Sequence, residues 1–241
     1  MSSLIFIAYG EAAVTNLIFV MRKGVGRLSQ YLVGIILPMY NEELSIKPLR
    51  EVFDKDLGLP SGCDHRIIVI DDGSKDNTLQ LVHKWAEENQ RVTIISHTRN
   101  MGVGQAILTG FNESVRMKSY CTVTLDADAS HPGALIAELV SGIQQGSDIV
   151  IASRFAAGGT MIGVPFLRKI YSYGARIMLT FFFPLHGVRD YTVGFRAYRT
   201  SLLCQALSQA QGSFLQFRSF ATSAEILLKM APLADKISEV P

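Results

Sequence analysis

Two aspartates one residue apart, Asp126 and Asp128, are the side chains of this sequence best placed to do chemistry. They follow residues 121–125, a short β-branched run that predicts a strand. Because side chains alternate along a strand, both carboxylates would point the same way at its carboxyl end. Mg²⁺ usually takes one or two protein carboxylates and leaves the rest of its shell to water and phosphate. The pair therefore predicts a divalent-cation site that is shared with a diphosphate.

The same design recurs earlier in the chain. Residues 67–70 form an apolar run too short for a helix, and Asp71, Asp72 and a glycine follow it. Beyond that turn, apolar residues recur at helical spacing and predict a helix that includes Leu79, Val82, Trp85 and Ala86. Three more short apolar runs lead into polar clusters, and they lie at residues 33–37, 92–95 and 148–152.

Strands that alternate with helices predict an α/β fold with a mostly parallel sheet and helices on both of its faces. Ligands of such sheets bind at the carboxyl ends of the strands. Every polar cluster described above lies at such an end. We therefore expect these clusters to converge on one site.

Composition agrees with a single α/β domain, which we place at residues 33–241. The chain has 241 residues, enough to bury one core, and its net charge of +2 argues against a nucleic-acid partner. Its three cysteines, Cys63, Cys121 and Cys204, lack paired spacing and predict reduced thiols.

Residues 1–32 form an N-terminal segment that is first apolar and then basic. The run from Leu4 to Val20 carries Glu11 and is shorter than the roughly 20 apolar residues that a spanning helix needs. Its cations follow the apolar run, whereas those of a signal peptide precede it. We expect an interfacial helix that lies on the domain or on a membrane surface, with a spanning anchor as the less favoured alternative.

Seven segments, in one order from residue 33 to the end, resemble the family-2 inverting glycosyltransferases with the GT-A fold. Within that family the chain is most similar to the dolichol-phosphate mannose synthases and related polyprenyl-phosphate hexosyltransferases. The resemblance implies a Rossmann-like sheet and a nucleotide-sugar donor, a GDP- or UDP-hexose. The segments that carry it are residues 37–43, 69–74, 99–104, 126–132, 152–155, 190–196 and 236–241.

On the donor side, the resemblance implies that Pro38, Tyr40 and Glu42 frame the nucleobase and ribose. Asp72 matches the acid of the family that contacts the base, and Asp71 is a candidate for the ribose, although the sequence does not separate the two. Gly102 lies in a glycine-containing turn that starts a helix near the donor.

For the metal, Mg²⁺ or Mn²⁺, the resemblance makes Asp128 the first choice as a direct and catalytically required ligand. Asp126 would help through the metal or through the ribose. Ser130 stands where family members often carry a glutamine near the metal, and serine is a weaker ligand.

The acceptor side depends on arginines in the second half of the chain. A phosphate monoester is already ionised near neutral pH, so it needs cations more than a general base, and arginine binds phosphate with two parallel hydrogen bonds. Arg154 matches the Ser-Arg motif of the family, and Arg168 stands where the family places an arginine toward the acceptor phosphate. Arg196 lies in a further matching segment and is assigned to substrate binding. Arg176 is interpreted as structural. Asp190 is assigned to positioning the sugar or acceptor, with a role as base as the weaker option.

Residues 161–187 are apolar and aromatic, with basic residues early in the stretch. The pattern alone fits an interfacial helix or an ordinary core helix equally well. The resemblance favours the interfacial helix, and with it a location at the cytoplasmic face of a membrane, where the chain would meet a polyprenyl-phosphate acceptor.

Three functions remain compatible with the sequence. The first is transfer of a hexose to a polyprenyl phosphate, the second is transfer to a sugar or protein hydroxyl, and the third is a non-catalytic subunit that binds nucleotide sugars. The presence of Asp126, Asp128 and Arg154 argues against the third. Relatives usually continue beyond the position of Pro241 with a strand and a basic stretch, which predicts a truncated C-terminal end and modestly favours the third function.

Overall fold

The computed structural model describes residues 31–128, 132–158, 166–210, 214–215 and 221–241, with side chains of 166–171 left out. Ser130 and the N-terminal segment up to residue 30 lie outside the described residues. The first strand already begins at Tyr31, two residues before the domain boundary expected from the sequence.

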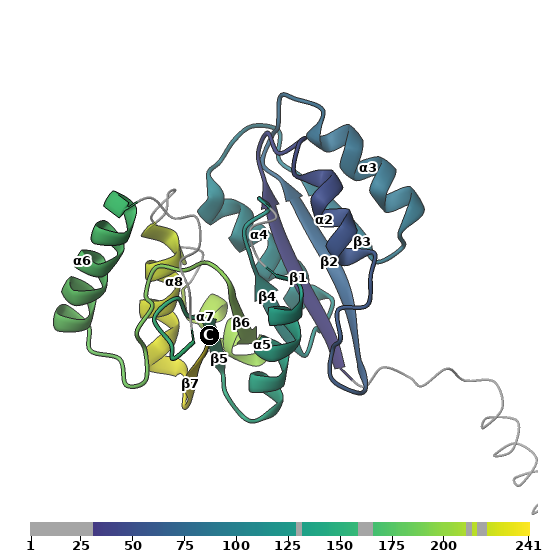
Figure 1. Ribbon diagram of the computed structural model, residues 1–241. Coiled ribbons are helices and arrows are strands. Elements are labelled where there is room, and N and C mark those ends of the chain that lie inside the picture. The colour runs from purple at the N-terminus through teal and green to yellow at the C-terminus, as the bar shows by residue number, and fades with distance from the viewer. Residues whose placement is uncertain (1–30, 129–131, 159–165, 211–213, 216–220) are drawn as a thin grey trace, which may run out of the picture.

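The described residues form a seven-stranded sheet with the strand order β3-β2-β1-β4-β6-β5-β7 (Figure 1). Its strands are β1 (Tyr31–Met39), β2 (Cys63–Asp71), β3 (Val92–Ser96), β4 (Cys121–Thr124), β5 (Ile149–Ala152), β6 (Arg196–Arg199) and β7 (Ile237–Val240). Only β6 among them runs antiparallel to its neighbours. The five strands expected from apolar runs are all present, and the mostly parallel α/β sheet is confirmed.

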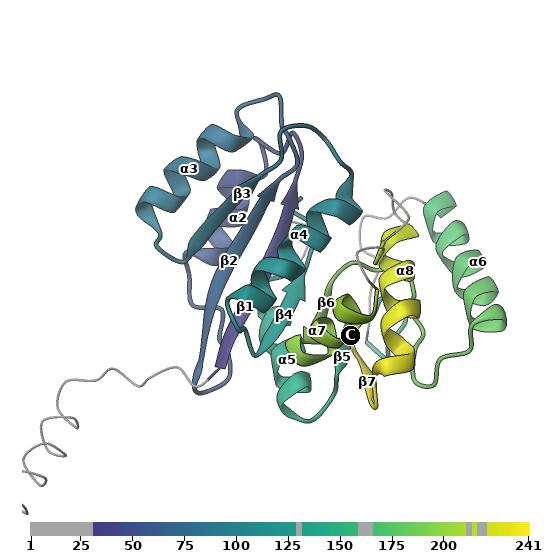
Figure 2. The ribbon, with the colours of Figure 1, turned by 180° about the vertical axis from the view of Figure 1, so that it is seen from behind.

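Helices cover both faces of the sheet (Figures 1 and 2). On one face lie α2 (Ile46–Phe53), α3 (Thr78–Glu88) and α5 (Ala134–Gln144), and on the other lie α4 (Val103–Arg116) and α7 (Thr200–Gln209). The remaining helices are α6 (Phe166–Phe182), α8 (Ala221–Met230) and the short 3₁₀ helix Ala231–Leu233. In both views α6 lies beyond α8, at the outer side of the molecule.

The central strands have buried side chains on both faces because helices cover them from both sides. Residues 67–70 of β2 and residues 35–37 of β1 are inaccessible to solvent. A strand buried on both faces is a continuous apolar run, which is the pattern that the sequence shows at these positions. The one tryptophan, Trp85, is fully buried on α3 and donates its indole N–H to Asp54 at 3.0 Å.

Helix α4 approaches β1 so closely that the contact needs glycine. A Cβ on Gly110 would lie 2.5 Å from the side chain of Ile36, and one on Gly34 would lie 2.4 Å from the hydroxyl of Ser114. Ser114 in turn contacts the hydroxyl of Thr122 at 2.7 Å, and Thr122 contacts Thr200 at 3.0 Å. This buried chain of hydroxyls links α4, β4 and α7.

No helix in the part of the chain that the structure describes is both long enough and apolar enough to cross a bilayer. The three cysteines are free, as the sequence predicts.

Two glycines inside helices provide a matched test of this packing. Gly110→Ala should lower the free energy of unfolding by about 1–3 kcal/mol, because the new methyl group overpacks against Ile36. Gly174→Ala in α6 meets no described atom within 4 Å, so it should instead stabilise its helix by up to about 1 kcal/mol. Urea unfolding of both variants measures the difference, and an unchanged or raised stability of Gly110→Ala would contradict the close packing.

Candidate active site

The loops that follow β1 and β2 are joined by reciprocal hydrogen bonds at the carboxyl edge of the sheet. The backbone N–H of Asn41 donates to the Ser74 hydroxyl at 3.0 Å, and the N–H of Lys75 donates to the Asn41 side chain at 2.8 Å. The N–H of Glu42 donates to Thr78 at 2.7 Å. Asn41 has a positive φ of 56°, a conformation that asparagine tolerates better than most residues. These bonds hold the two loops as one unit.

Asp72 joins the loop after β3 to this unit. Its carboxylate accepts the backbone N–H of Met101 at 2.9 Å and that of Gly102 at 2.8 Å. Gly102 has a φ of 91° and precedes the first residue of α4. Its N–H is therefore already donated to Asp72, and its carbonyl accepts the N–H groups of Gln105 and Ala106 at the start of α4.

The other residues predicted to bind the donor lie at the same edge. Tyr40 is exposed and Pro38 is half-buried, whereas Asp71 is buried and accepts the N–H of Ser74 at 3.3 Å within its own turn. Glu42 is half-buried and accepts the hydroxyl of Ser45 at 2.6 Å. The structure thus brings these residues together and leaves Tyr40 the most accessible of them.

Asp126 and Asp128 follow β4 and are both exposed, while Ala127 between them is buried. This alternation is the one expected from the sequence. A Cβ on Gly194 would lie 3.5 Å from a carboxylate oxygen of Asp126, so the loop 190–194 passes beside the acidic pair. Within the described residues no group of three or more His, Cys, Asp or Glu side chains could hold a metal. Two exposed carboxylates are within the number that Mg²⁺ usually takes from a protein when a phosphate ligand completes its shell.

Arg154, just after β5, forms a two-pronged ion pair with the fully buried Asp190. Its Nε and one terminal nitrogen lie 2.8 Å from the two oxygens of Asp190, and the same terminal nitrogen donates to Thr192 at 2.7 Å. The hydrogen bonds that Arg154 donates to Asp190 raise the pKa of Arg154, and they outweigh its burial, which would lower it. The side chain of Arg154 is 28% exposed, whereas that of Asp190 is fully buried.

Asp190 is saturated with hydrogen bonds, which rules against its use as a base. Burial would raise the pKa of its carboxyl, but the bonds and charge of Arg154, together with the N–H groups of Thr192 and Val193, outweigh burial and lower the pKa. A carboxylate with a lowered pKa and no access to solvent is a poor proton acceptor. The role of Asp190 as a base is therefore corrected. Its role in positioning the sugar or the acceptor stays a prediction.

Arg196 does not lie where the sequence placed it. It was expected to bind substrate, but it begins β6, is fully buried and donates to the backbone carbonyls of Ser223 and Tyr191 at 2.6 and 2.8 Å. Its guanidinium therefore ties β6 to the segment that holds Asp190 and to α8. We correct its assignment from substrate binding to structural support.

Arg168 lies on α6, and its side chain is outside the described residues. Further along the same helix, Arg176 places its guanidinium carbon 4.8 Å from the ring centre of Phe155, and Arg154 lies 5.7 Å from the same centre. Phe155 also contacts Tyr173 of α6 edge-on at 5.2 Å. Phe155 was not among the site residues predicted from the sequence, yet it connects α6 to Arg154. Its position directly after Arg154 in a matching segment could have pointed to it.

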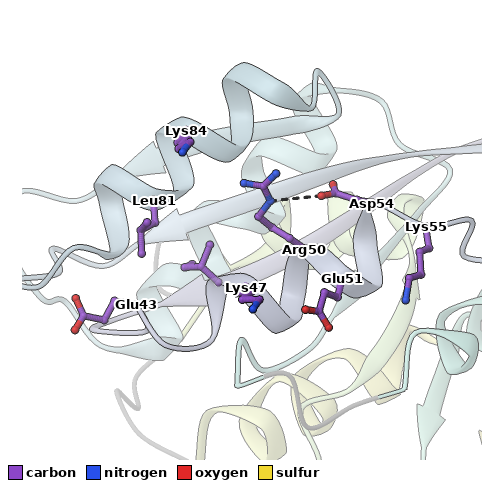
Figure 3. Close-up of a pocket in the computed structure, with 9 residues that line it drawn as sticks. Glu43, Lys47, Arg50, Glu51, Asp54, Lys55, Leu81 and Lys84 are labelled. Atoms are coloured by element: carbon purple, nitrogen blue, oxygen red, sulfur yellow. Dashed lines mark hydrogen bonds and ion pairs between the residues drawn. The ribbon is translucent and has the colours of Figure 1, made fainter.

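A cleft of about 440 Å³ lies elsewhere, between α2 and α3 (Figure 3). Lysines and acids alternate around it, and Arg50 forms ion pairs with Asp54 and Glu88. None of the residues predicted from the sequence to bind substrate lines it. We therefore place the candidate active site at the carboxyl edge of the sheet and not in this cleft.

The mostly parallel sheet with acidic and basic side chains at its carboxyl edge is the architecture of the GT-A glycosyltransferases. Residues 34–205 match the family model described as glycosyl transferase family 2, and the chain belongs to that family.

Named relatives agree with this family. A dolichol-phosphate mannosyltransferase from Pyrococcus furiosus is 32% identical over 210 residues, which cover 87% of this chain and 55% of that protein. A UDP-N-acetylglucosamine–dolichyl-phosphate N-acetylglucosaminyltransferase from Methanococcus voltae is 30% identical over 227 residues, which cover 89% and 86%. This chain therefore spans about half the length of the first relative and most of the second.

Among solved structures, the mannosyltransferase PcManGT from Pyrobaculum calidifontis, in complex with GDP-Man and Mn²⁺, superimposes with a TM-score of 0.57. The two chains are 20% identical, and the match covers 97% of this chain and 64% of that one. At this identity the likeness shows the shared fold.

The ion pair gives a pH-dependent prediction. Because the pKa of Asp190 is lower in the folded protein, its stabilising contribution is present above the unfolded-state pKa and is lost as the pH falls through the folded-state pKa. Asp190→Asn should lower the free energy of unfolding at pH 7 by about 3–5 kcal/mol, because it leaves Arg154 partly buried without its charge partner.

Urea unfolding between pH 7 and pH 3 measures this effect, with the exposed Asp235→Asn as the control. The Asp190 variant should lose less stability than the wild type below about pH 4, the usual range of aspartate titration. Equal pH profiles for wild type and Asp190→Asn would contradict the assignment.

Proposed function

We propose that this chain transfers a hexose from a nucleotide sugar to a polyprenyl phosphate, with inversion at the anomeric carbon. The observation that carries the proposal is the position of the exposed Asp126 and Asp128 beside the loop 190–194, whose Asp190 holds Arg154. Through a bound cation, Asp126 and Asp128 could stabilise a leaving diphosphate, and Arg154 could hold a phosphate acceptor. The names of both relatives include a dolichol or dolichyl phosphate, which supports an acceptor of this class.

The donor would lie over the loops after β1, β2 and β3. Pro38, Tyr40 and Glu42 would frame the base and ribose, with the turn at Asp71 and Asp72 below them. A GDP- or UDP-hexose fits the proposal, since PcManGT is solved with GDP-Man and the M. voltae relative is named for UDP-N-acetylglucosamine.

Asp128 and Asp126 fit a hard divalent cation, Mg²⁺ or Mn²⁺, because they are exposed carboxylates one residue apart on the same side of the chain. When bound, such a cation acts as a Lewis acid that stabilises negative charge on the diphosphate. PcManGT is solved with Mn²⁺, which supports a divalent ion here. Ser130 remains a proposed third ligand outside the described residues.

On the acceptor side, Arg154 would hold the phosphate with the part of its guanidinium that Asp190 and Thr192 do not occupy. Arg168, at the start of α6, would add a second cation. An ionised phosphate oxygen can attack the anomeric carbon from the face opposite the diphosphate, while the bond to the diphosphate breaks and its electron pair leaves with that group. No proton has to be removed from the acceptor, which agrees with a site whose buried aspartate cannot act as a base.

Helix α6 supports contact with a membrane surface. Phe181 and Phe182 are 77% and 66% exposed, and Ile177 is 69% exposed, which is unusual for large apolar side chains on one helix. Tyr173, Met178 and Phe183 extend the same exposed set. We propose that this surface lies in the interface of the bilayer and brings the lipid phosphate to Arg154 and Arg168, at the cytoplasmic face of the membrane.

The proposal is tested by incubating the protein with radiolabelled GDP- and UDP-hexoses and a short polyprenyl phosphate, followed by extraction into organic solvent. We expect an acid-labile, lipid-soluble product. Label found only on a water-soluble glycoside or on protein would replace the proposal with a hydroxyl acceptor. Nucleotide binding without any transfer would favour the non-catalytic subunit.

In the same assay, Asp128→Asn should lower turnover about a hundredfold or more, because the cation contributes several kcal/mol and 1.36 kcal/mol corresponds to a factor of ten. Its melting temperature should change little, since Asp128 is exposed. The exposed Asp235→Asn serves as the control and should keep wild-type activity. Full turnover of Asp128→Asn in EDTA would contradict the role of the metal.

The membrane contact is tested with the double variant Ile177→Ser/Phe181→Ser. It should bind liposomes at least tenfold more weakly, because burial of either side chain is worth about 1.5–3 kcal/mol. Turnover with a long-chain acceptor in liposomes should fall in parallel, whereas turnover with a short soluble acceptor should be kept. Leu81→Ser on α3 is the matched apolar control. Equal liposome binding by both variants and the wild type would contradict the proposal.

A further inference from the structure

Asp72, His97 and Thr109 form a continuous chain of hydrogen bonds from the end of β2 to α4. The Nδ1 atom of His97 lies 2.6 Å from a carboxylate oxygen of Asp72, and its Nε2 atom lies 2.9 Å from the hydroxyl of Thr109. The side chains of Asp72 and His97 are 4% and 10% exposed. The chain is therefore almost fully shielded from solvent.

The partners determine how the imidazole of His97 is used. An ionised carboxylate only accepts hydrogen bonds, so Nδ1 carries a proton and donates it to Asp72. In the neutral ring Nε2 then accepts the hydroxyl proton of Thr109. Both ring nitrogens are satisfied, and His97 has no atom left with which to bind a substrate.

The carboxylate of Asp72 accepts three hydrogen bonds, and all three come from residues after β3. One oxygen accepts from His97 and from the N–H of Met101, and the other accepts from the N–H of Gly102. Gly73 packs closely against the same loop, since a Cβ on it would lie 2.6 Å from the backbone of Arg99. The loop of residues 99–102 is thus fixed both by hydrogen bonds and by close backbone packing.

This loop lies at the same edge of the sheet as the candidate donor site, because it follows β3 and is bonded to Asp72. Arg99, Asn100 and Met101 are exposed, and the turn at Gly73 to which the loop is joined is in turn bonded to the loop of Asn41. A loop held in one conformation binds a ligand more tightly, because it does not lose conformational entropy when the ligand binds.

We propose that His97 is a positioning residue for the nucleotide half of the donor, and that it acts through Asp72 on the loop 99–102. The inference rests on the proposed function, because it takes a nucleoside diphosphate as the ligand of this edge. It adds to the predicted contact of Asp72 with the base a second role, as a clamp for the loop. Neither residue is catalytic, so their loss should weaken the donor and leave the chemical step intact.

The first experiment needs no ligand. Hydrogen–deuterium exchange at the amides of Met101 and Gly102 should be at least about tenfold faster in His97→Ala than in the wild type, because the amides lose a fixed acceptor. His97→Asn, whose amide nitrogen can occupy the place of Nδ1, should restore most of the protection. The exposed His83→Ala on α3 is the matched control and should exchange as the wild type does. Unchanged exchange in His97→Ala would overturn the clamp.

The second experiment measures GDP and UDP binding by calorimetry, together with KM for the donor and kcat. His97→Ala should weaken the preferred nucleotide and raise the donor KM at least about tenfold, with kcat at saturating donor within about twofold of the wild type. His97→Asn should come within about threefold of wild-type affinity, and KM for the acceptor should not move. Thermal unfolding verifies that each variant is folded.

Thr109→Val keeps the shape of its side chain and removes only the bond to Nε2, so it should give a smaller effect in the same direction if His97→Ala does not fold. Wild-type affinity in a folded His97→Ala, with faster loop exchange, would overturn the positioning role alone. A wild type that binds neither GDP nor UDP would overturn the proposed function and the positioning role together.

Discussion

Parallel pairing of β1, β2, β3 and β4 is the constraint on which this structure depends. Each parallel connection must return over a face of the sheet, so helices bury both faces and leave only the strand ends for polar chemistry. The carboxyl ends of these strands lie at one edge, and each continues into a loop with acidic or amide side chains. Residues separated by up to about 90 positions, such as Tyr40 and Asp128, therefore lie at the same edge of the sheet.

Within that edge the charged groups divide into two kinds. Asp126 and Asp128 remain exposed, whereas Asp190 is buried and its charge is matched by Arg154. A buried carboxylate persists only when it is paired and hydrogen-bonded, and it then stiffens its partner. Arg154 is consequently held in one orientation before any ligand arrives. Asp72 acts in a similar way. Its hydrogen bonds hold the backbone of the loop 99–102, whereas those of Asp190 hold the side chain of Arg154.

Much of the fold could be predicted from the sequence. The five strands with continuous apolar runs are present, because burial on both faces leaves a local signal that pairing does not alter. Strand β6 was missed, since Arg196-Ala-Tyr-Arg199 has no apolar alternation, and its burial depends on carbonyl partners from α8 and the Asp190 loop. Arg196 itself was misassigned for the same reason: a sequence does not show whether a guanidinium meets a ligand or a carbonyl.

The sequence by itself determined the α/β class, the place of each acidic cluster at a strand end and the alternation of exposed and buried residues from Asp126 to Asp128. These follow from local rules, namely the period of two along a strand and the length of an apolar run. Only the tertiary structure decided which carboxylates stay accessible. Asp72 and Asp190 look no different from the exposed Asp128 in the sequence, but both are buried, and the side chains that bind them, His97 and Arg154, lie 25 and 36 residues away. Whether a carboxylate is buried or accessible is set by such long-range contacts.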